Sequence, residues 1–113
     1  MDQDGLKFCF LDTETTGLDY KTNNIIEMGW IITDLHLNVI KQESFIINGE
    51  FEISEFIKNL TGISKEKTLI EGVSLETAYK QLYEDIIQCQ FLVAHNVLFD
   101  YNFIIQEIKN LFK

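Results

Sequence analysis

The chain has 113 residues, a formal net charge of −9 and a hydrophobic fraction of 46%. These values are typical of one small soluble domain with a single core. The excess of acid argues against broad electrostatic binding to nucleic acid, which needs clustered lysine and arginine, but it is compatible with an enzyme that holds a phosphodiester through metal ions.

The cysteines and the apolar runs exclude several other classes of protein. Cys9 and Cys89 lie far apart, match no metal-binding spacing and are predicted to be buried, inert thiols, so a disulfide framework is not expected. The N-terminal residues do not resemble a signal peptide, and no apolar run reaches membrane length. We therefore expect a cytoplasmic protein without a membrane partner.

The first half of the chain predicts a meander of three strands. The first strand is expected over residues 6–12 and the second over residues 25–33, where the residues of one face are apolar: Ile26, Met28, Trp30 and Ile32. The third is expected over residues 39–47 and is less buried, because Lys41 and Glu43 share its apolar face. Asn48 and Gly49 form a turn that closes the meander.

The second half predicts helices around a fourth strand. Ser54 caps a short helix that Gly62 ends, and Ser74 caps a longer one. Residues 91–94 form a buried strand, and the last helix follows His95 and Asn96. This order predicts an α/β sheet packed by helices, with the first strand central. The expected core residues include Phe8, Phe10, Trp30, Val93 and Ile105.

Three carboxylates are candidates for a metal site. Asp12 and Glu14 are separated by one residue at the end of the first strand, so their side chains point the same way. Asp100 lies at the start of the last helix and would come near them if the fourth strand pairs beside the first. Such a cluster would hold one or two hard divalent cations. The alternative for Asp100 is a helix N-terminal acid favoured by the dipole.

Several segments together resemble one enzyme family. Residues 10–18 (FLDTETTGL) followed by residues 25–29 (IIEMG) are similar to the first motif of the DnaQ-like (DEDDh) 3′–5′ exonucleases. Residues 60–64 (LTGIS) resemble an internal segment of that family, and residues 93–100 (VAHNVLFD) resemble its second motif. The resemblance implies a ribonuclease-H-like mixed sheet and a metal-dependent exonuclease site.

The resemblance also implies roles for individual residues. Asp12, Glu14 and Asp100 match the catalytic acids that hold two Mg²⁺ or Mn²⁺ ions, and Glu14 would help to orient the attacking water. His95 is expected to position its loop rather than to act in catalysis, and Thr61 falls where relatives contact the substrate sugar. The substrate-side positions are Thr13, Thr15, Gly17, Leu18, Thr61, His95, Asn96 and Phe99.

One part of the family pattern is missing. The family has a third motif, a histidine that acts as general base and, a few residues later, a final metal-binding aspartate. The only histidines here are His36, expected in a turn, and His95, which belongs to the second motif. Residues 1–113 are therefore expected to be the N-terminal portion of an exonuclease domain, truncated before a last strand and helix and inactive alone. A pseudoenzyme is the alternative.

The resemblance predicts an enzyme that removes nucleotides from single-stranded or frayed DNA 3′ ends, in replication proofreading or repair. An RNA 3′-exonuclease of the same family is an alternative, because the choice depends on how the site receives the 2′-hydroxyl. A non-catalytic module that binds nucleic acid or a polymerase is another. The same motifs occur in exonuclease domains fused to polymerases or helicases, so a polymerase or helicase is the expected protein partner.

Overall fold

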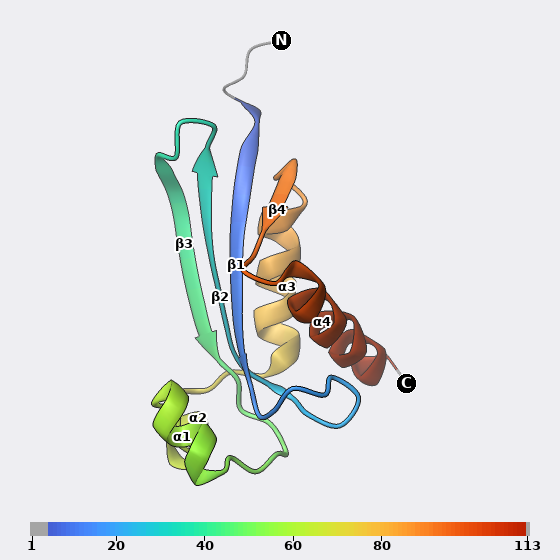
Figure 1. The fold of residues 1–113 in the computed structure, drawn as a ribbon. Coiled ribbons are helices and arrows are strands. Elements are labelled where there is room, and N and C mark those ends of the chain that lie inside the picture. Colours follow the sequence, from blue (N-terminus) through green and yellow to red (C-terminus); the bar gives the residue numbers. More distant parts are fainter. Residues whose placement is uncertain (1–4, 113) are drawn as a thin grey trace.

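A computed structural model describes residues 5–112, so the N-terminal start, where no signal peptide is expected, lies outside the described residues. Three strands come first along the chain, followed by three helices, a fourth strand and a last helix (Figure 1). The elements are β1 (Lys7–Thr15), β2 (Ile25–Asp34), β3 (Val39–Ile46), α1 (Glu55–Thr61), α2 (Lys65–Glu71), α3 (Leu75–Ile86), β4 (Phe91–Val93) and α4 (Val97–Leu111).

The sheet is mixed and has the strand order β3-β2-β1-β4, which confirms the predicted meander and the central position of the first strand. β2 is antiparallel to both β1 and β3, whereas β4 runs parallel to β1. β1 is longer than predicted, because its ladder with β2 continues past the two acids to Thr15 opposite Ile25. β4 pairs only with Phe8, Cys9 and Phe10, so the chain leaves the sheet just before Asp12 and turns into α4.

The helix boundaries follow local capping signals. The hydroxyl of Ser54 accepts a hydrogen bond from the Ile57 backbone N–H, and Ser74 does the same for Thr77. Gly62 ends α1 with a φ of 78°, a left-handed conformation that favours glycine. These three predictions are confirmed. The sequence analysis missed α2, a seven-residue helix whose one buried residue, Thr68, provides no apolar stripe.

The core lies between one face of the sheet and the helices α3 and α4, which are drawn beside that face in Figure 1. Its buried residues include Cys9 and Leu11 from β1, Met28, Trp30 and Ile32 from β2, Ala78 and Leu82 from α3, and Phe103 from α4. A smaller cluster of Ile26, Ile57 and Ile63 attaches α1 to the end of the sheet where β1 ends and β2 begins.

The predicted core was partly wrong. Of the five expected residues only Trp30 is buried; Phe8, Phe10 and Ile105 are half-buried, and Val93 is 37% exposed. Side chains alternate along β1, so Cys9 and Leu11 face the helices while Phe8 and Phe10 face the other side. Both sets are apolar, and only the packing of the helices distinguishes them. The two thiols are free, with Cys9 buried as predicted and Cys89 half-buried.

We expect Leu11→Ala to lower the free energy of unfolding by about 2–5 kcal/mol, because it empties a buried position. Phe10→Ala, one residue earlier, should have less than half that effect, since its side chain is only partly buried. Urea denaturation of the two variants measures both losses in the free energy of unfolding. Equal losses would mean that helices cover both faces of the strand.

Within residues 5–112, no helix is both long enough and apolar enough to cross a membrane.

Candidate active site

Asp12 and Glu14 lie on the face of β1 that the helices leave uncovered. Asp12 is exposed and Glu14 half-buried, while Thr13 between them is buried on the opposite face. The ladder places Glu14 opposite Glu27 of β2. Burial raises the pKa of Glu14, and the charges of Asp12, Glu27 and Asp100 raise it further. Negative charge is therefore concentrated at this end of the strand.

Asp100 approaches β1 from the helix side. It lies in the first turn of α4, where it is 5% exposed and accepts a hydrogen bond from the Thr13 hydroxyl. Burial raises the pKa of Asp100, the Thr13 hydroxyl opposes that shift, and the charge of Asp12 adds to it. Asp100 is thus electrostatically coupled to both strand acids, although Thr13 lies between them.

The three acids do not form a complete ligand set in this arrangement. Among residues 5–112, no group of three His, Cys, Asp or Glu side chains lies close enough to hold one ion, because Asp100 contacts the face of β1 opposite to that of Asp12 and Glu14. The donor chemistry nevertheless fits a hard divalent cation, which prefers carboxylate oxygens. A cation would also relieve the repulsion that raises the pKa values of Glu14 and Asp100.

A pocket of about 520 Å³ opens beside Glu14, where β1, the β1–β2 loop, α1 and α4 meet. Its volume is within the range of small-molecule sites. Its lining unites six of the residues expected on the substrate side: Thr13, Thr15, Gly17, Leu18, Thr61 and Phe99. The side of α1 contributes Phe56, Ile57 and Leu60, which the sequence analysis did not identify. Leu18 is 85% exposed and Leu60 69% exposed, so apolar surface is available to a ligand.

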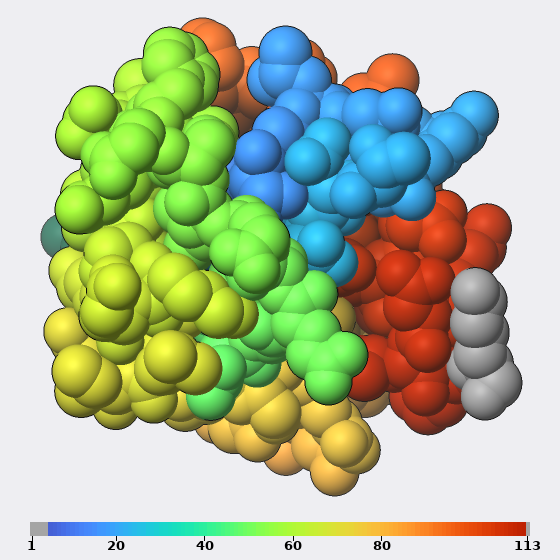
Figure 2. Space-filling view, turned by 90° about the horizontal axis from the view of Figure 1, so that it is seen from below, coloured from blue at the N-terminus to red at the C-terminus, as the bar shows by residue number. Residues whose placement is uncertain are grey.

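Short hydrogen bonds hold the β1–β2 loop, residues 16–24, at this pocket. The Thr15 hydroxyl donates to the Gly17 carbonyl over 2.6 Å, and the Thr16 hydroxyl donates to Asn23 Oδ1 over 3.0 Å. A Cβ atom at Gly17 would lie only 2.7 Å from the Asn23 side chain, so a larger residue there would force that side chain to move. In Figure 2 the loop is the light-blue segment, with the green residues of α1 and its approach beside it.

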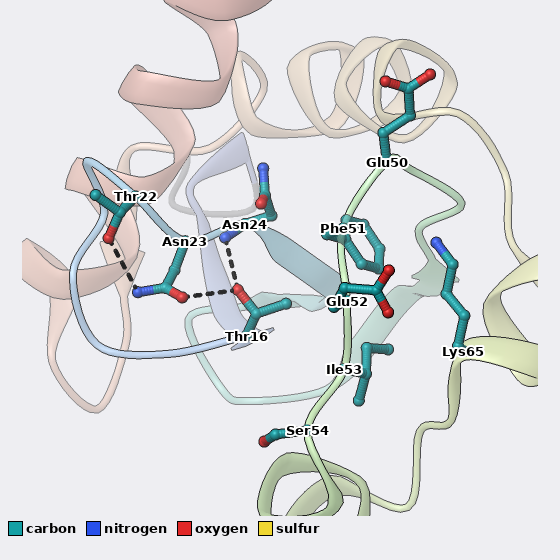
Figure 3. Close-up of a pocket in the computed structure, with 10 residues that line it drawn as sticks. All are labelled: Thr16, Thr22, Asn23, Asn24, Glu50, Phe51, Glu52, Ile53, Ser54 and Lys65. Atoms are coloured by element: carbon teal, nitrogen blue, oxygen red, sulfur yellow. Dashed lines mark hydrogen bonds between the residues drawn. The ribbon is translucent and has the colours of Figure 1, made fainter.

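A second, wider cavity of about 700 Å³ lies on the other side of Thr16 (Figure 3). Residues 50–54 and Lys65 face the loop across it, and it shares Thr16 and Ser54 with the first pocket. Lys65 donates to the Gly49 carbonyl over 2.7 Å and lies 4.7 Å from the centre of the Phe51 ring. Its charge is therefore directed to the wall of this cavity rather than to the acids.

Two residues of the first pocket use their hydroxyls within the protein, and two further expected residues, His95 and Asn96, lie outside the lining of that pocket. The Thr13 hydroxyl is bound to Asp100, and the Thr61 hydroxyl donates to the Ile57 carbonyl, so both hydroxyls have partners within the protein. Asn96 caps α4 by accepting from the Phe99 backbone N–H. His95 is exposed at the start of α4, near enough to Asp100 to lower its pKa.

Comparison with known proteins identifies the family. A family model described as "Exonuclease" matches residues 9–113, nearly the whole chain. The chain belongs to the exonuclease family. The resemblance inferred from the motifs is thereby confirmed.

Relatives of this exonuclease-family chain occur inside much longer proteins. It is 32% identical over 101 residues to "DNA polymerase III PolC-type" of Mycoplasmopsis pulmonis, covering 89% of this chain and 7% of that protein. It is 38% identical over 98 residues to "3′-5′ exonuclease DinG" of Staphylococcus epidermidis, covering 86% of this chain and 10% of that protein. The chain thus spans about a tenth or less of these relatives.

The fold is that of exonuclease I. A crystal structure of E. coli exonuclease I in complex with a dT13 oligonucleotide superposes with a TM-score of 0.78 at 21% identity, covering 88% of this chain and 22% of that one. This likeness confirms the predicted mixed α/β fold of the ribonuclease-H-like class.

Proposed function

We propose that this chain is part of a metal-dependent 3′–5′ exonuclease that removes nucleotides from DNA 3′ ends. The observation that carries the proposal is the pocket beside Glu14, because it unites Gly17, Leu18, Thr61 and Phe99 from three separate segments. A nucleotide seated there would place its 5′-phosphate next to the acids at the end of β1.

The chain's own residues would bind and orient the terminal nucleotide. Leu18, Leu60 and Phe99 offer apolar surface to a base, and the Thr15 and Gly17 backbone borders the space for its sugar. Glu14, which lines the same pocket, would accept a hydrogen bond from the attacking water and so orient it. Orientation of this kind removes much of the entropic barrier to a bimolecular step.

The charge of the site supports the use of a divalent ion. The lining of the pocket contains one carboxylate and no lysine, and the chain carries a net charge of −9, so a phosphate would be repelled. Asp12, Glu14 and Asp100 are the residues that would hold Mg²⁺ or Mn²⁺. When bound, such ions polarise the phosphate and lower the pKa of water.

The names of the relatives support DNA as the substrate and replication or repair as the process. They include a DNA polymerase III and a DinG exonuclease, each far longer than this chain. A DNA polymerase or a helicase is therefore the protein partner that we propose. The free thiols of Cys9 and Cys89 are consistent with a reducing compartment such as the cytoplasm.

Binding of the reaction product tests the proposal without requiring catalysis. Deoxythymidine 5′-monophosphate should bind the chain in the presence of Mn²⁺ or Mg²⁺. In the diamagnetic Mg²⁺ form, two-dimensional NMR should show that the nucleotide shifts the amide resonances of residues 15–18 and 61. Leu18→Ala should weaken binding at least about fivefold, since ~1 kcal/mol of apolar contact is lost.

The matched control is Ile70→Ala on α2, because Ile70 is 83% exposed and Leu18 is 85% exposed, but Ile70 lies outside the pocket. Asp12→Asn should weaken the metal-dependent part of the binding. Binding that is equally strong in EDTA, or that Leu18→Ala leaves unchanged, would contradict the proposed site.

A further inference from the structure

Glu107 is a buried acid that the proposed reaction does not use. It is 7% exposed and lies on the face of α4 that also buries Asp100 and Phe103. The spacing of these residues places them one above another along the helix. Burial raises the pKa of Glu107. Hydrogen bonds with the Ile25 backbone and with the side chains of Asn24 and Asn110 oppose that rise. An apolar residue would pack here at lower cost, so a carboxylate calls for a specific reason.

A contact with the β1–β2 loop explains why a carboxylate is buried at position 107. The Asn24 side-chain amide donates to Glu107 Oε1 over 3.3 Å. The backbone of Asn24 closes the loop, since its carbonyl accepts from the Thr16 N–H over 2.9 Å and its N–H donates to the Thr16 hydroxyl over 3.0 Å. Figure 3 shows Thr16 bonded to both Asn23 and Asn24. Glu107 is therefore hydrogen-bonded to the residue that closes the loop.

Two other residues on the same face of α4 also contact β1 and the β1–β2 loop. Asp100 accepts from Thr13 on β1, and the ring of Phe103 lies 6.4 Å from the ring of Tyr20 in the middle of the loop, in an edge-to-face arrangement. One face of α4 thus contacts the strand before the loop, the loop itself and its last residue. The same helix supplies Phe99 to the pocket, opposite Gly17 and Leu18.

We propose that Glu107 is a positioning residue, which holds the β1–β2 loop against α4 so that Gly17 and Leu18 face Phe99 at the separation that a nucleotide needs. This inference rests on the proposed function for its consequence, but the contact itself can be tested without any ligand. Glutamine at position 107 keeps the acceptor oxygen for Asn24, whereas leucine removes it at similar volume.

Amide hydrogen exchange by NMR measures the contact directly. Glu107→Leu should speed exchange of the Thr16 and Asn24 amides about tenfold, the effect of losing one hydrogen bond to a charged group. Glu107→Gln should stay within about threefold of the wild type, since a neutral hydrogen bond remains. Leu82→Ala is the control, because Leu82 is a core residue of α3 whose loss lowers global stability without removing the Glu107–Asn24 hydrogen bond.

Affinity for deoxythymidine 5′-monophosphate with Mg²⁺ measures the consequence. The nucleotide affinity should fall about tenfold in Glu107→Leu and change little in Glu107→Gln or Leu82→Ala. The affinity for Mn²⁺ alone should be unchanged in all three variants. The inference is overturned if loop amides respond alike to Glu107→Leu and Leu82→Ala, if glutamine behaves as leucine does, or if a nucleotide binds equally well to the leucine variant. If the wild type binds no nucleotide, the proposed function fails, and the exchange rates alone decide whether Glu107 holds the loop.

Discussion

The 113-residue chain is expected to trim a labelled single-stranded DNA oligonucleotide from its 3′ end about 10²–10⁴-fold more slowly than a related exonuclease does. The reference enzyme is the DinG exonuclease of Staphylococcus epidermidis, assayed under the same conditions with Mn²⁺ at neutral pH. That factor is the usual contribution of a general base. Neither of the two histidines lines the pocket. His36 lies in the β2–β3 turn, at the end of the sheet opposite to α1 (Figure 1), and His95 is exposed just before α4.

Two controls separate slow catalysis from contamination and from a failed fold. Residual trimming by the chain itself should disappear in Asp12→Asn. Added imidazole should raise the rate of the wild-type chain, because it would offer a general base from solution. Trimming as fast as that of the relative, lost in Asp12→Asn and also in His95→Ala, would contradict the prediction and identify His95 as the base.

The largest loss of stability from a polar substitution is expected at Asp85. This carboxylate of α3 is 3% exposed and joins the helix to the sheet by accepting from Trp30 Nε1 at 2.8 Å and Lys41 Nζ at 2.8 Å. It also accepts from Gln81 Nε2 of its own helix at 3.2 Å. Asp85→Leu would leave the buried indole N–H without an acceptor. We expect a loss of about 2–4 kcal/mol in the free energy of unfolding, measured by urea denaturation.

The acid dependence of stability provides a second measurement of the same contact. Burial alone would raise the pKa of Asp85, but the hydrogen bonds from Lys41 and Trp30 outweigh it and hold the pKa below its usual range. A carboxyl of lowered pKa contributes stability above its unfolded pKa of about 3.9, and that stability is lost as the pH falls through the folded value. Asp85→Asn should therefore flatten the acid limb of the stability curve.

The control is Glu84→Gln, because Glu84 is the exposed neighbour of Asp85 on the same helix. It should leave both the unfolding free energy and the acid limb nearly unchanged. A similar loss in both variants would mean that the hydrogen bonds of Asp85 do not hold α3 on the sheet.

The sequence by itself determined the class of fold, the family and the local boundaries. Residues 10–18 identify a strand that ends in acids, and the hydroxyls of Ser54 and Ser74 predict two helix starts, because each of these features depends only on neighbours a few positions away. Even the alternation that places Asp12 and Glu14 on one face follows from the geometry of a single strand.

Tertiary structure alone decided which face of β1 is covered. Phe8 and Phe10 on one side and Cys9 and Leu11 on the other are equally apolar, so the pattern of β1 cannot choose between them. The choice depends on the side of the sheet on which the chain crosses from β3 to β4. The helices cross on the side of Cys9 and Leu11, and the expectation of a buried Phe10 was therefore wrong.

The packing of α1, α3 and α4 decided the contacts of the site and of the other buried acids. Asp100 is bound to Thr13 and lies across the strand from Asp12, while Phe56 and Leu60 of α1 complete a pocket with Leu18 and Phe99. In the sequence, Glu107 and Asp85 look like ordinary acids on the surface of a helix. Their partners, Asn24 for Glu107 and Trp30 for Asp85, are far away along the chain. Contacts between distant segments depend on how whole elements pack, and no local pattern encodes that packing.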